Sequence, residues 1–525
     1  MPLFRSSLLL VSIIAVSGCA NYLPNFERPA APVSEIINKA AQGKIQQVSL
    51  TAWQEFFPDE KTKVLIALAL QNNRDLHIAA ANVAEAQGLF QIQRQALIPD
   101  INAQGGATYS GNSRNLTGNN NTSQNFSTNV GWTSYEIDFW GRVKSLKEAA
   151  LATYFATLEA QRSSKLTVIA STASAYSNWL IATQKLQLAD QTLEGRRESF
   201  ELIKLRESIG VASALDLAQA EVAQLTVEAQ RAQFVRALIQ AKANLELLVG
   251  KPVAAILQQP ALSESADFDF TIPHKLSSQL ILARPDVMLA EEKLRAANAN
   301  IGAARAAFLP RISLVGSAGF ASSGLSKLFS SDATNWSFAP AISIPLFGNS
   351  NKANLEVAKA RNERSIAEYE QVIQIAFSEI YIELESRKSR QLEISTNQRL
   401  VTAEQKRLYL AQERYNAGLA SYIEVLDSQQ NLFSSQQSLL DAEHGDTLSI
   451  IQLYRALGGG DGLKSSFRQR AALSEKSTSK DDSSLKLSKE KVQAIDVQDV
   501  QDVQEVREVQ EVQEVQEVQE VQEVQ

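Results

Sequence analysis

Cys19 is the only cysteine among the 525 residues, so no disulfide can form within the chain. It follows a short start with one basic residue, an apolar run over residues 8–16 and the small pair Ser17-Gly18. This pattern predicts a secretory signal peptide over residues 1–18, too short to cross a membrane as a mature helix.

A lone cysteine is often a small buried apolar residue. Here the run Val16-Ser17-Gly18-Cys19 fits the lipobox cut by the lipoprotein signal peptidase, which predicts diacylglycerol and an acyl chain on Cys19. The residue that follows is alanine rather than an Asp retention signal, which favours the outer membrane.

Glu424 and Asp427 stand three residues apart in a segment with helical composition, so their carboxylates share one helical face. They follow the turn signal Gly418-Leu419-Ala420-Ser421, which repeats an earlier signal, Gly210-Val211-Ala212-Ser213. Glycine suits the position after a helix end, and a serine followed three residues later by an acid predicts a capping box. Capping explains these residues without any partner, and contact with a partner is compatible with it.

Residues of the kind that enzymes use do not gather in this sequence. The three histidines, His77, His274 and His444, are scattered, and neither a Cys/His metal spacing nor a phosphate-binding glycine loop occurs. The sequence therefore predicts no enzyme, no cofactor and no metal site. A net charge of −7 with both signs interspersed also argues against a nucleic-acid partner.

The chain repeats itself. Four landmarks recur in the same order at offsets of 207 to 211 residues, among them Asn73-Arg74-Asp75-Leu76 against Arg284-Pro285-Asp286-Val287. We expect a lipidated, extended segment over 19–60 and two repeats at 61–250 and 275–458. A linker over 251–274 would join them, and a low-complexity, disordered tail of Glu-Val-Gln repeats would occupy 459–525.

Each repeat is expected to contain a leading helix, two strands, a long helix, a turn and a return helix. Prolines are absent between Pro99 and Pro252 and after Pro345, so residues 142–209 and 349–417 can each form one helix about 100 Å long. The return segments are shorter, so they need the leading helices, 61–98 and 284–309, stacked end to end with them. An apolar stripe from Ile366 to Leu384 steps by three and four residues, as in a coiled coil.

Between each leading helix and long helix lie two strand-like runs. Over residues 336–344, Trp, Phe, Pro and Ile alternate with Ser and Ala, which fits a strand between lipid and a lumen or an ordinary half-buried strand. In the first repeat, the alternation changes parity between Trp132 and Tyr135, which predicts a bulge. Four strands per chain cannot close a barrel, whereas two chains give eight strands and three chains give twelve with room for a pore.

Several stretches of the sequence resemble a known family. The stretches 282–287, 295–304 and 336–347 and the duplicated Gly-x-Ala-Ser turns resemble TolC-type outer-membrane factors, in the lipoprotein branch serving resistance-nodulation-division efflux pumps. The resemblance implies an α+β membrane protein, a homotrimer whose twelve-stranded transmembrane β-barrel continues into a long α-helical barrel in the periplasm. It implies a passive, gated exit duct for small molecules, docked to a periplasmic adaptor and an inner-membrane transporter of that class.

Family roles pass to matching positions of this chain. The turns at Gly210, Val211, Ala212 and Ser213 and at Gly418, Leu419, Ala420 and Ser421 match the periplasmic tips that meet the adaptor. Glu424 and Asp427 match carboxylates at the periplasmic constriction, and three copies around an axis would favour cations. The family often has Arg where this chain has Gln430, which puts any ion pair through that residue in doubt.

Two other functions fit parts of the sequence. The exit duct of a type I protein-secretion system would share the same architecture, although the lipobox and the stretches near 284 and 336 are closer to the efflux branch. A structural lipoprotein that tethers envelope layers through long helices would need no strands, so the predicted strand pairs count against it.

Overall fold

The computed structural model describes residues 22–29, 52–112, 121–258, 281–347 and 350–459. Cys19, the centre of the linker and the Glu-Val-Gln tail lie outside these ranges. The first repeat contains α3 (Trp53–Phe56), α4 (Glu60–Asn72), α5 (Arg74–Gln95), β1 (Asn102–Asn112), β2 (Asn121–Ile137), α7 (Arg142–Ser208), α8 (Ala214–Val249) and α9 (Ala254–Gln258). The second contains α11 (Pro285–Ala306), β3 (Arg311–Ser322), the short 3-10 turns η1 (Leu325–Lys327) and η2 (Ser331–Ala333), β4 (Thr334–Ser343), α12 (Asn351–Asn416) and α13 (Tyr422–Ala456).

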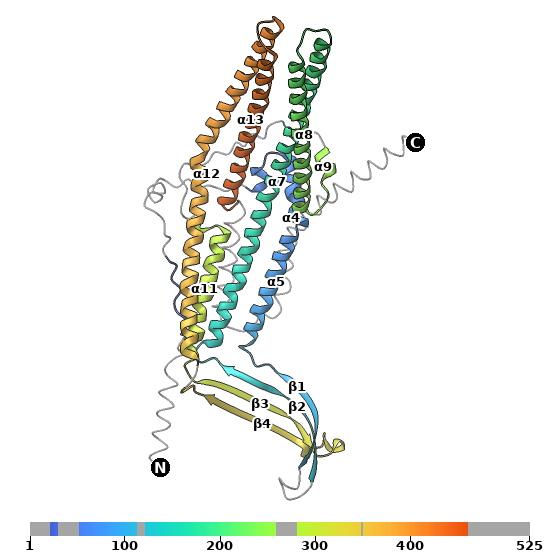
Figure 1. Cartoon of the computed structure of the whole chain (residues 1–525). Coiled ribbons are helices and arrows are strands. Elements are labelled where there is room, and N and C mark those ends of the chain that lie inside the picture. The colour runs from blue at the N-terminus through green and yellow to red at the C-terminus, as the bar shows by residue number, and fades with distance from the viewer. Residues whose placement is uncertain (1–21, 30–51, 113–120, 259–280, 348–349, 460–525) are drawn as a thin grey trace. The chain divides into compact units, whose positions relative to one another are not determined.

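The two long helices are present as predicted. α7 has 67 residues and α12 has 66, about 100 Å each, and each turns back into a shorter helix to form a hairpin (Figure 1). The predicted stripe on α12 is its buried face, with Tyr369, Ile373, Ala376 and Ile380 packed against α11 and the end of α13. Alternating three- and four-residue steps therefore point this row of side chains into the core.

The leading helix of the first repeat differs from the prediction, which ran it unbroken over 61–98. It divides at Asn73, whose backbone is extended and whose side chain accepts hydrogen bonds from the N–H groups of Asp75 and Leu76. An asparagine that caps the next turn competes with the helix that precedes it. The break sets the start of α5 beside the end of α8, because Asn73 Nδ2 donates to Leu248 O at 2.9 Å.

The end-to-end stacking of short helices occurs in both repeats. In the second, Arg284 precedes α11 and its Nη1 donates to Ala456 O at the end of α13, at 2.7 Å. Each repeat thus ties the start of the helix that precedes its strands, α5 or α11, to the last turn of its return helix. Two short helices in line can then accompany one long helix.

The four strands form one antiparallel sheet in the order β1-β2-β3-β4, so both repeats contribute a hairpin to it (Figure 1). β2 pairs with β3, and its register shifts between Trp132 and Tyr135, which confirms the predicted bulge. Gly316 makes room for the Trp132 ring, since a Cβ there would lie 2.6 Å from it. The outer edges of β1 and β4 have no strand partner within the described residues.

Apolar side chains on β4 are exposed in the single chain. Trp336 is 75% exposed and Ile342 is 67% exposed, on the face that alternates with Ser and Ala. Large exposed apolar residues on a sheet with open edges require a covering surface, either lipid or protein. Among the residues that the structure describes, no helix is both long and apolar enough to cross a membrane.

Candidate functional site

Both hairpin turns have the same backbone. Gly210 and Gly418 have φ values of 78° and 72°, which place them in the left-handed region that glycine adopts freely. The N–H of Val211 donates to Arg206 O, and the N–H of Leu419 donates to Arg414 O, each at 2.8 Å. These bonds from the third residue after the helix back into its last turn end α7 and α12 in the same way.

The capping prediction is confirmed at the first turn only. Ser213 and Asp216 form the reciprocal capping box of α8, with the Asp216 N–H at 3.1 Å from Ser213 Oγ. Ser421 makes no side-chain cap on α13, so the prediction that Glu424 completes a second box was wrong. The longer Glu424 side chain reaches across the hairpin, and its Oε2 lies 4.0 Å from Arg414 Nη2. The Glu424 N–H donates to the Ser421 carbonyl oxygen at 3.2 Å, so the Ser421 hydroxyl does not receive it.

The tips expose apolar side chains. Val211 is 71% exposed and Leu419 is 72% exposed, and the first helical residues beyond the turns add Leu215 at 66% and Ile423 at 53%. The sequence analysis named Val211 and Leu419 but missed Leu215 and Ile423. The signal was available, because each is an apolar residue two positions after the serine of its turn.

Asp427 pairs with an arginine that the sequence analysis also missed. Its Oδ2 accepts a hydrogen bond from Arg407 Nη2 on α12, and Arg407 Nη1 lies 3.4 Å from Glu404 Oε2. In an antiparallel hairpin, residues nearly equidistant from the turn face each other, which would have identified Arg407. Gln430, next along α13 after Gln429, is exposed.

A groove of about 720 Å³ runs between α12 and α13 beside these pairs. It is lined by both carboxylates of the predicted gate, Glu424 and Asp427, and by three basic residues, Lys406, Arg407 and Arg414. The predicted gate residues Glu424 and Asp427 therefore lie together, and basic side chains of the neighbouring helix α12 face them. The pairs are exposed to solvent, so each holds the hairpin with a small free energy, about 0.2–1 kcal/mol.

Contacts between the two hairpins lie just behind the tips. The Arg206 guanidinium of α7 stacks over the Tyr415 ring of α12 at 5.3 Å, and Tyr415 packs on Tyr422 with ring centroids 5.4 Å apart. Arg196 Nη1 of α7 donates to Gln429 Oε1 of α13. Burial raises the pKa of the Tyr422 phenol and lowers the pKa of Arg196. These contacts connect the second hairpin to the first.

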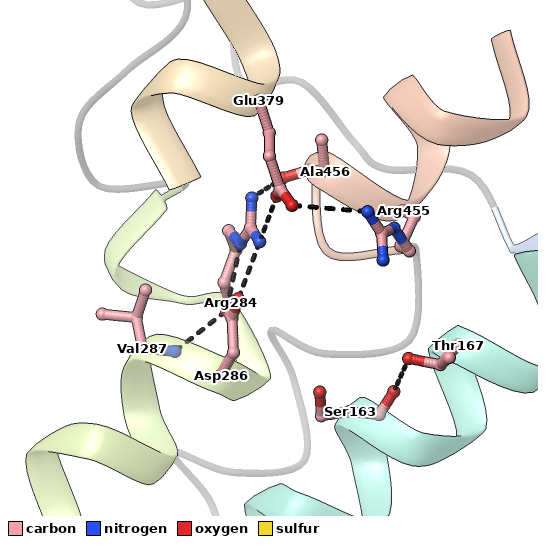
Figure 2. Close-up of polar contacts among 8 residues, drawn as sticks. All are labelled: Ser163, Thr167, Arg284, Asp286, Val287, Glu379, Arg455 and Ala456. Carbon is pink, nitrogen blue, oxygen red and sulfur yellow. Dashed lines mark hydrogen bonds and ion pairs between the residues drawn. The ribbon is translucent and has the colours of Figure 1, made fainter. Parts of the chain in front are cut away.

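Arg284 is the centre of a second polar cluster, far along the helices from the tips. Figure 2 shows its guanidinium between Asp286 and Glu379, with Nη2 at 2.7 Å from Asp286 Oδ2 and 2.8 Å from Glu379 Oε2. Arg455 also reaches Glu379, at 3.3 Å. The Arg284 side chain is only 7% exposed, so these partners must stabilise its buried positive charge. We call this cluster, with the Ala456 carbonyl, the Arg284 clasp.

The segment Tyr22–Pro29, which we call the strap, lies along α11. Arg28 pairs with Glu291 at 2.5 Å, Asn298 Nδ2 donates to Pro24 O at 3.1 Å, and the Arg295 guanidinium lies 4.2 Å from the Phe26 ring centre. Tyr22 packs edge-on against Trp140 at 6.5 Å. Trp140 in turn donates to Pro310 O at the start of β3, so the strap ends where helices meet the sheet.

Within the described residues, no group of three or more His, Cys, Asp or Glu side chains is placed to hold a metal ion. His444 stands apart from His77 on a different helix, and burial lowers its pKa. His274 lies outside the described ranges.

The duplicated helix-strand-strand-hairpin plan and one shared sheet define the class. The chain belongs to the outer membrane efflux protein family, whose model matches residues 65–251 and again residues 276–459. It is an outer-membrane component of an efflux system, as the sequence analysis predicted, and the predicted α+β fold is confirmed.

Particular relatives agree with this assignment. The chain is 38% identical to the cation efflux system protein CusC of Escherichia coli K12 over 451 residues, covering 85% of this chain and 97% of that one. It is 37% identical to the probable efflux pump outer membrane protein TtgC of Pseudomonas putida, covering 86% and 95%. The open-state crystal structure of the Neisseria gonorrhoeae MtrE outer membrane channel matches with a TM-score of 0.74 at 33% identity, covering 83% of this chain and 98% of that one. These relatives are transport proteins.

Proposed function

We propose that the chain forms a homotrimeric, passive and gated exit duct for small molecules, with twelve strands in the outer membrane and the helices in the periplasm. The observation that carries this proposal is the four-stranded sheet with two open edges and an exposed apolar face. Unpaired strand edges cannot face lipid, so the edges of β1 and β4 must meet those of other copies. Four strands are too few for a barrel, and three copies provide twelve, enough for a pore.

The hairpin tips are proposed as the contact for a periplasmic adaptor. Exposed Val211, Leu215, Leu419 and Ile423 offer a small apolar surface at two matched turns, with Ala212, Ser213, Ala420 and Ser421 beside them. A helical hairpin can pack its apolar residues against such a surface. The inner-membrane partner would be a resistance-nodulation-division transporter, which would supply the energy, so this chain would catalyse no reaction.

Glu424 and Asp427 are proposed as the periplasmic gate, latched to Arg414 and Arg407. The support is the pairing between α12 and α13 in the groove beside the tip. Opening would separate these exposed pairs, each held by a small free energy, so an adaptor could release them by binding.

Lipidation of Cys19 is proposed from the lipobox together with the strap. Cys19 stands three residues before Tyr22 in the sequence, and Tyr22 packs against Trp140. Trp and Tyr favour the membrane–water interface, and this contact lies at the junction of helices and sheet. A lipid there could enter the bilayer around the barrel. Mass spectrometry of the N-terminal peptide should show diacylglycerol and an acyl chain, and an unmodified cysteine would contradict this.

The duct itself is tested by two measurements on the purified full chain. We expect a mass of three chains in detergent and single-channel currents in planar bilayers. A monomer that does not conduct and binds bilayers only through its acyl chains would instead support a tether. The relatives named above are efflux components, which supports small molecules over secreted proteins as the cargo.

A further inference from the structure

A second groove, of about 860 Å³, lies among α7, α11 and α12, away from the tips. Small-molecule sites have volumes of roughly 300–1,000 Å³, so the groove can hold a compound of drug size. Its floor is the small-residue face of α11, including Ala297 and Ala304, and Ala156 of α7 and Ala358 of α12 contribute to its walls. The small side chains leave the space and give it an apolar lining.

The groove and the strap occupy opposite faces of α11. Positions 291, 295, 298 and 302 contact the strap, whereas positions 293, 297, 300 and 304 line the groove. At about 3.6 residues per turn, these two sets are half a turn apart. If Cys19 carries lipid inserted in the surrounding bilayer, the strap lies on the outer surface of the tube. The groove then faces the interior of the duct, an assignment that rests on the proposed function.

Positive charge gathers around this groove. Lys293 of α11 and Arg361 and Arg364 of α12 line it, and Glu368 is the only carboxylate among its lining residues. Arg364 pairs with Glu368 at 3.4 Å. Lys293 and Arg361 are exposed, and within the described part of the chain neither has an ion pair. Two cations per copy are therefore available to a ligand, and a trimer would carry six around the duct.

We propose that this groove is a binding site for drug-sized anionic amphiphiles passing through the duct. The carboxylate or sulfonate of such a compound would contact Lys293 and Arg361, and its apolar body would lie on the alanine floor. Charge fixes the orientation, and burial of apolar surface adds affinity. The duct wall would then favour acidic cargo at this level.

The test uses the full-length protein in lipid nanodiscs, with empty nanodiscs as the blank. The probe is 8-anilinonaphthalene-1-sulfonate, and the matched uncharged probe is N-phenyl-1-naphthylamine, which shares its aromatic body. Equilibrium dialysis should show saturable binding of the sulfonate at one dye per chain. In the double variant Lys293→Gln/Arg361→Gln, its Kd should rise about tenfold, because two exposed charge contacts, each worth a few-fold in affinity, are lost.

Controls separate charge in the groove from charge in general. Lys388→Gln removes an exposed cation from α12 outside the groove and should leave the Kd unchanged. Glu368→Gln should tighten binding of the sulfonate, because it frees Arg364. The uncharged probe should bind equally to all variants. Equal sulfonate binding by the wild type and the double variant, with the trimer intact, would overturn the proposal.

Current blockade tests the direction that the groove faces. The sulfonate should interrupt single-channel currents of the wild type, and interruptions should be about tenfold shorter in the double variant. Normal currents with no sulfonate effect would overturn the inward-facing site and leave the duct intact. Dye binding that depends on Lys293 and Arg361 in a protein that does not conduct would preserve the site and refute the duct.

Discussion

The two repeats share a backbone plan and differ in the charged side chains at matched positions. At the junction of short helices, Asn73 caps α5 and donates to Leu248 O, while its counterpart Arg284 donates to Ala456 O and also binds Asp286 and Glu379. The first repeat thus ties two helix ends together with a neutral side chain. The second adds a buried cation that also holds a third helix, α12.

The hairpin tips of the two repeats also differ in the contacts of their charged side chains. In the first hairpin, Asp216 caps its own helix, whereas in the second Glu424 and Asp427 face arginines of the opposite helix. The positions that correspond to Arg407 and Asp427 are Ser199 and Gln219, which cannot form an ion pair. Near the tip, polar groups of the first hairpin therefore stabilise a helix, and those of the second hold two helices together. Arg231 of α8 also pairs with Asp190 of α7, about 20 residues from the first turn. Among the described residues, the exposed ion pairs between helices that lie beside a tip therefore belong to the second hairpin.

The largest expected effect is on the free energy of unfolding, and it distinguishes the junction at Arg284 from the junction at Asn73. Arg284→Met should lower the free energy of unfolding by about 3–5 kcal/mol, because it removes the cation from a largely buried cluster and leaves Glu379 with Arg455 alone. Asn73→Ala, which loses a cap and one hydrogen bond, should cost about 1–2 kcal/mol. Thermal unfolding followed by circular dichroism checks both variants. Equal losses would show that the added charge of the second junction contributes nothing.

A smaller effect is expected at the gate. Asp427→Ala should raise the open-to-closed ratio on the order of tenfold, since three exposed pairs at about 0.2–1 kcal/mol each are lost per trimer. The matched change in the first hairpin, Gln219→Ala, should leave single-channel conductance unchanged. The exchange Arg407→Asp/Asp427→Arg should restore closure. If the exchange conducts like Asp427→Ala, the latch is not an ion pair.

The capping difference predicts a local effect. Ser213→Ala should destabilise the first turn of α8 by about 1 kcal/mol, because it breaks a complete capping box. Ser421→Ala should change α13 far less, since its side chain makes no cap. Hydrogen exchange of the amides in these two turns measures both. Faster exchange of equal size in the two variants would contradict the asymmetry.

The smallest effect concerns pH at His444 on α13. Burial lowers its pKa below the ordinary value of 6.5, Lys185 of α7 lowers it further and Asp441 raises it. Arg390 of α12 lies close as well, since it donates to Gly445 O. A lowered pKa in the folded state means that the stabilisation is complete above about pH 6.5 and is lost as pH falls through the folded value. Hydrogen-exchange protection factors of α13 near His444, which correct for the intrinsic pH dependence of amide exchange, should therefore fall on mild acidification, and His444→Gln should abolish that dependence.

Much of the fold followed from the sequence. Absence of proline and helix-forming composition predicted α7 and α12 to within two residues, and the alternation around Trp132 predicted the bulge in β2. Both features depend on local sequence. The break at Asn73 was missed because its cause is partly distant, in the Leu248 carbonyl that its side chain binds.

The candidate site was harder to predict for the same reason. The turns and Asp427 could be located from spacing, but the partner of Asp427 lies on another helix 20 residues away in sequence. The missing cap at Ser421 depends on backbone geometry, because the Glu424 N–H donates to the Ser421 carbonyl oxygen rather than to its hydroxyl. Lys293 and Arg361 are 68 residues apart in sequence, and only the packing of α11 beside α12 brings them to one groove. The spacing of residues along one helix shows which of them share a face. It does not show which other helix packs against that face.

The Arg284 clasp stands at one end of α13, and the gate residues stand at the other. From Ala456 to Tyr422 is 34 residues, so the helix is a lever about 50 Å long with the clasp near its fulcrum. A tilt of only about 10° at the clasp would move the tip by about 9 Å, more than the reach of an ion pair. The width of the opening would then be set by small rotations at a buried arginine far from the tips. A small loosening of the contacts around Arg284 would therefore produce a large displacement of the hairpin tip.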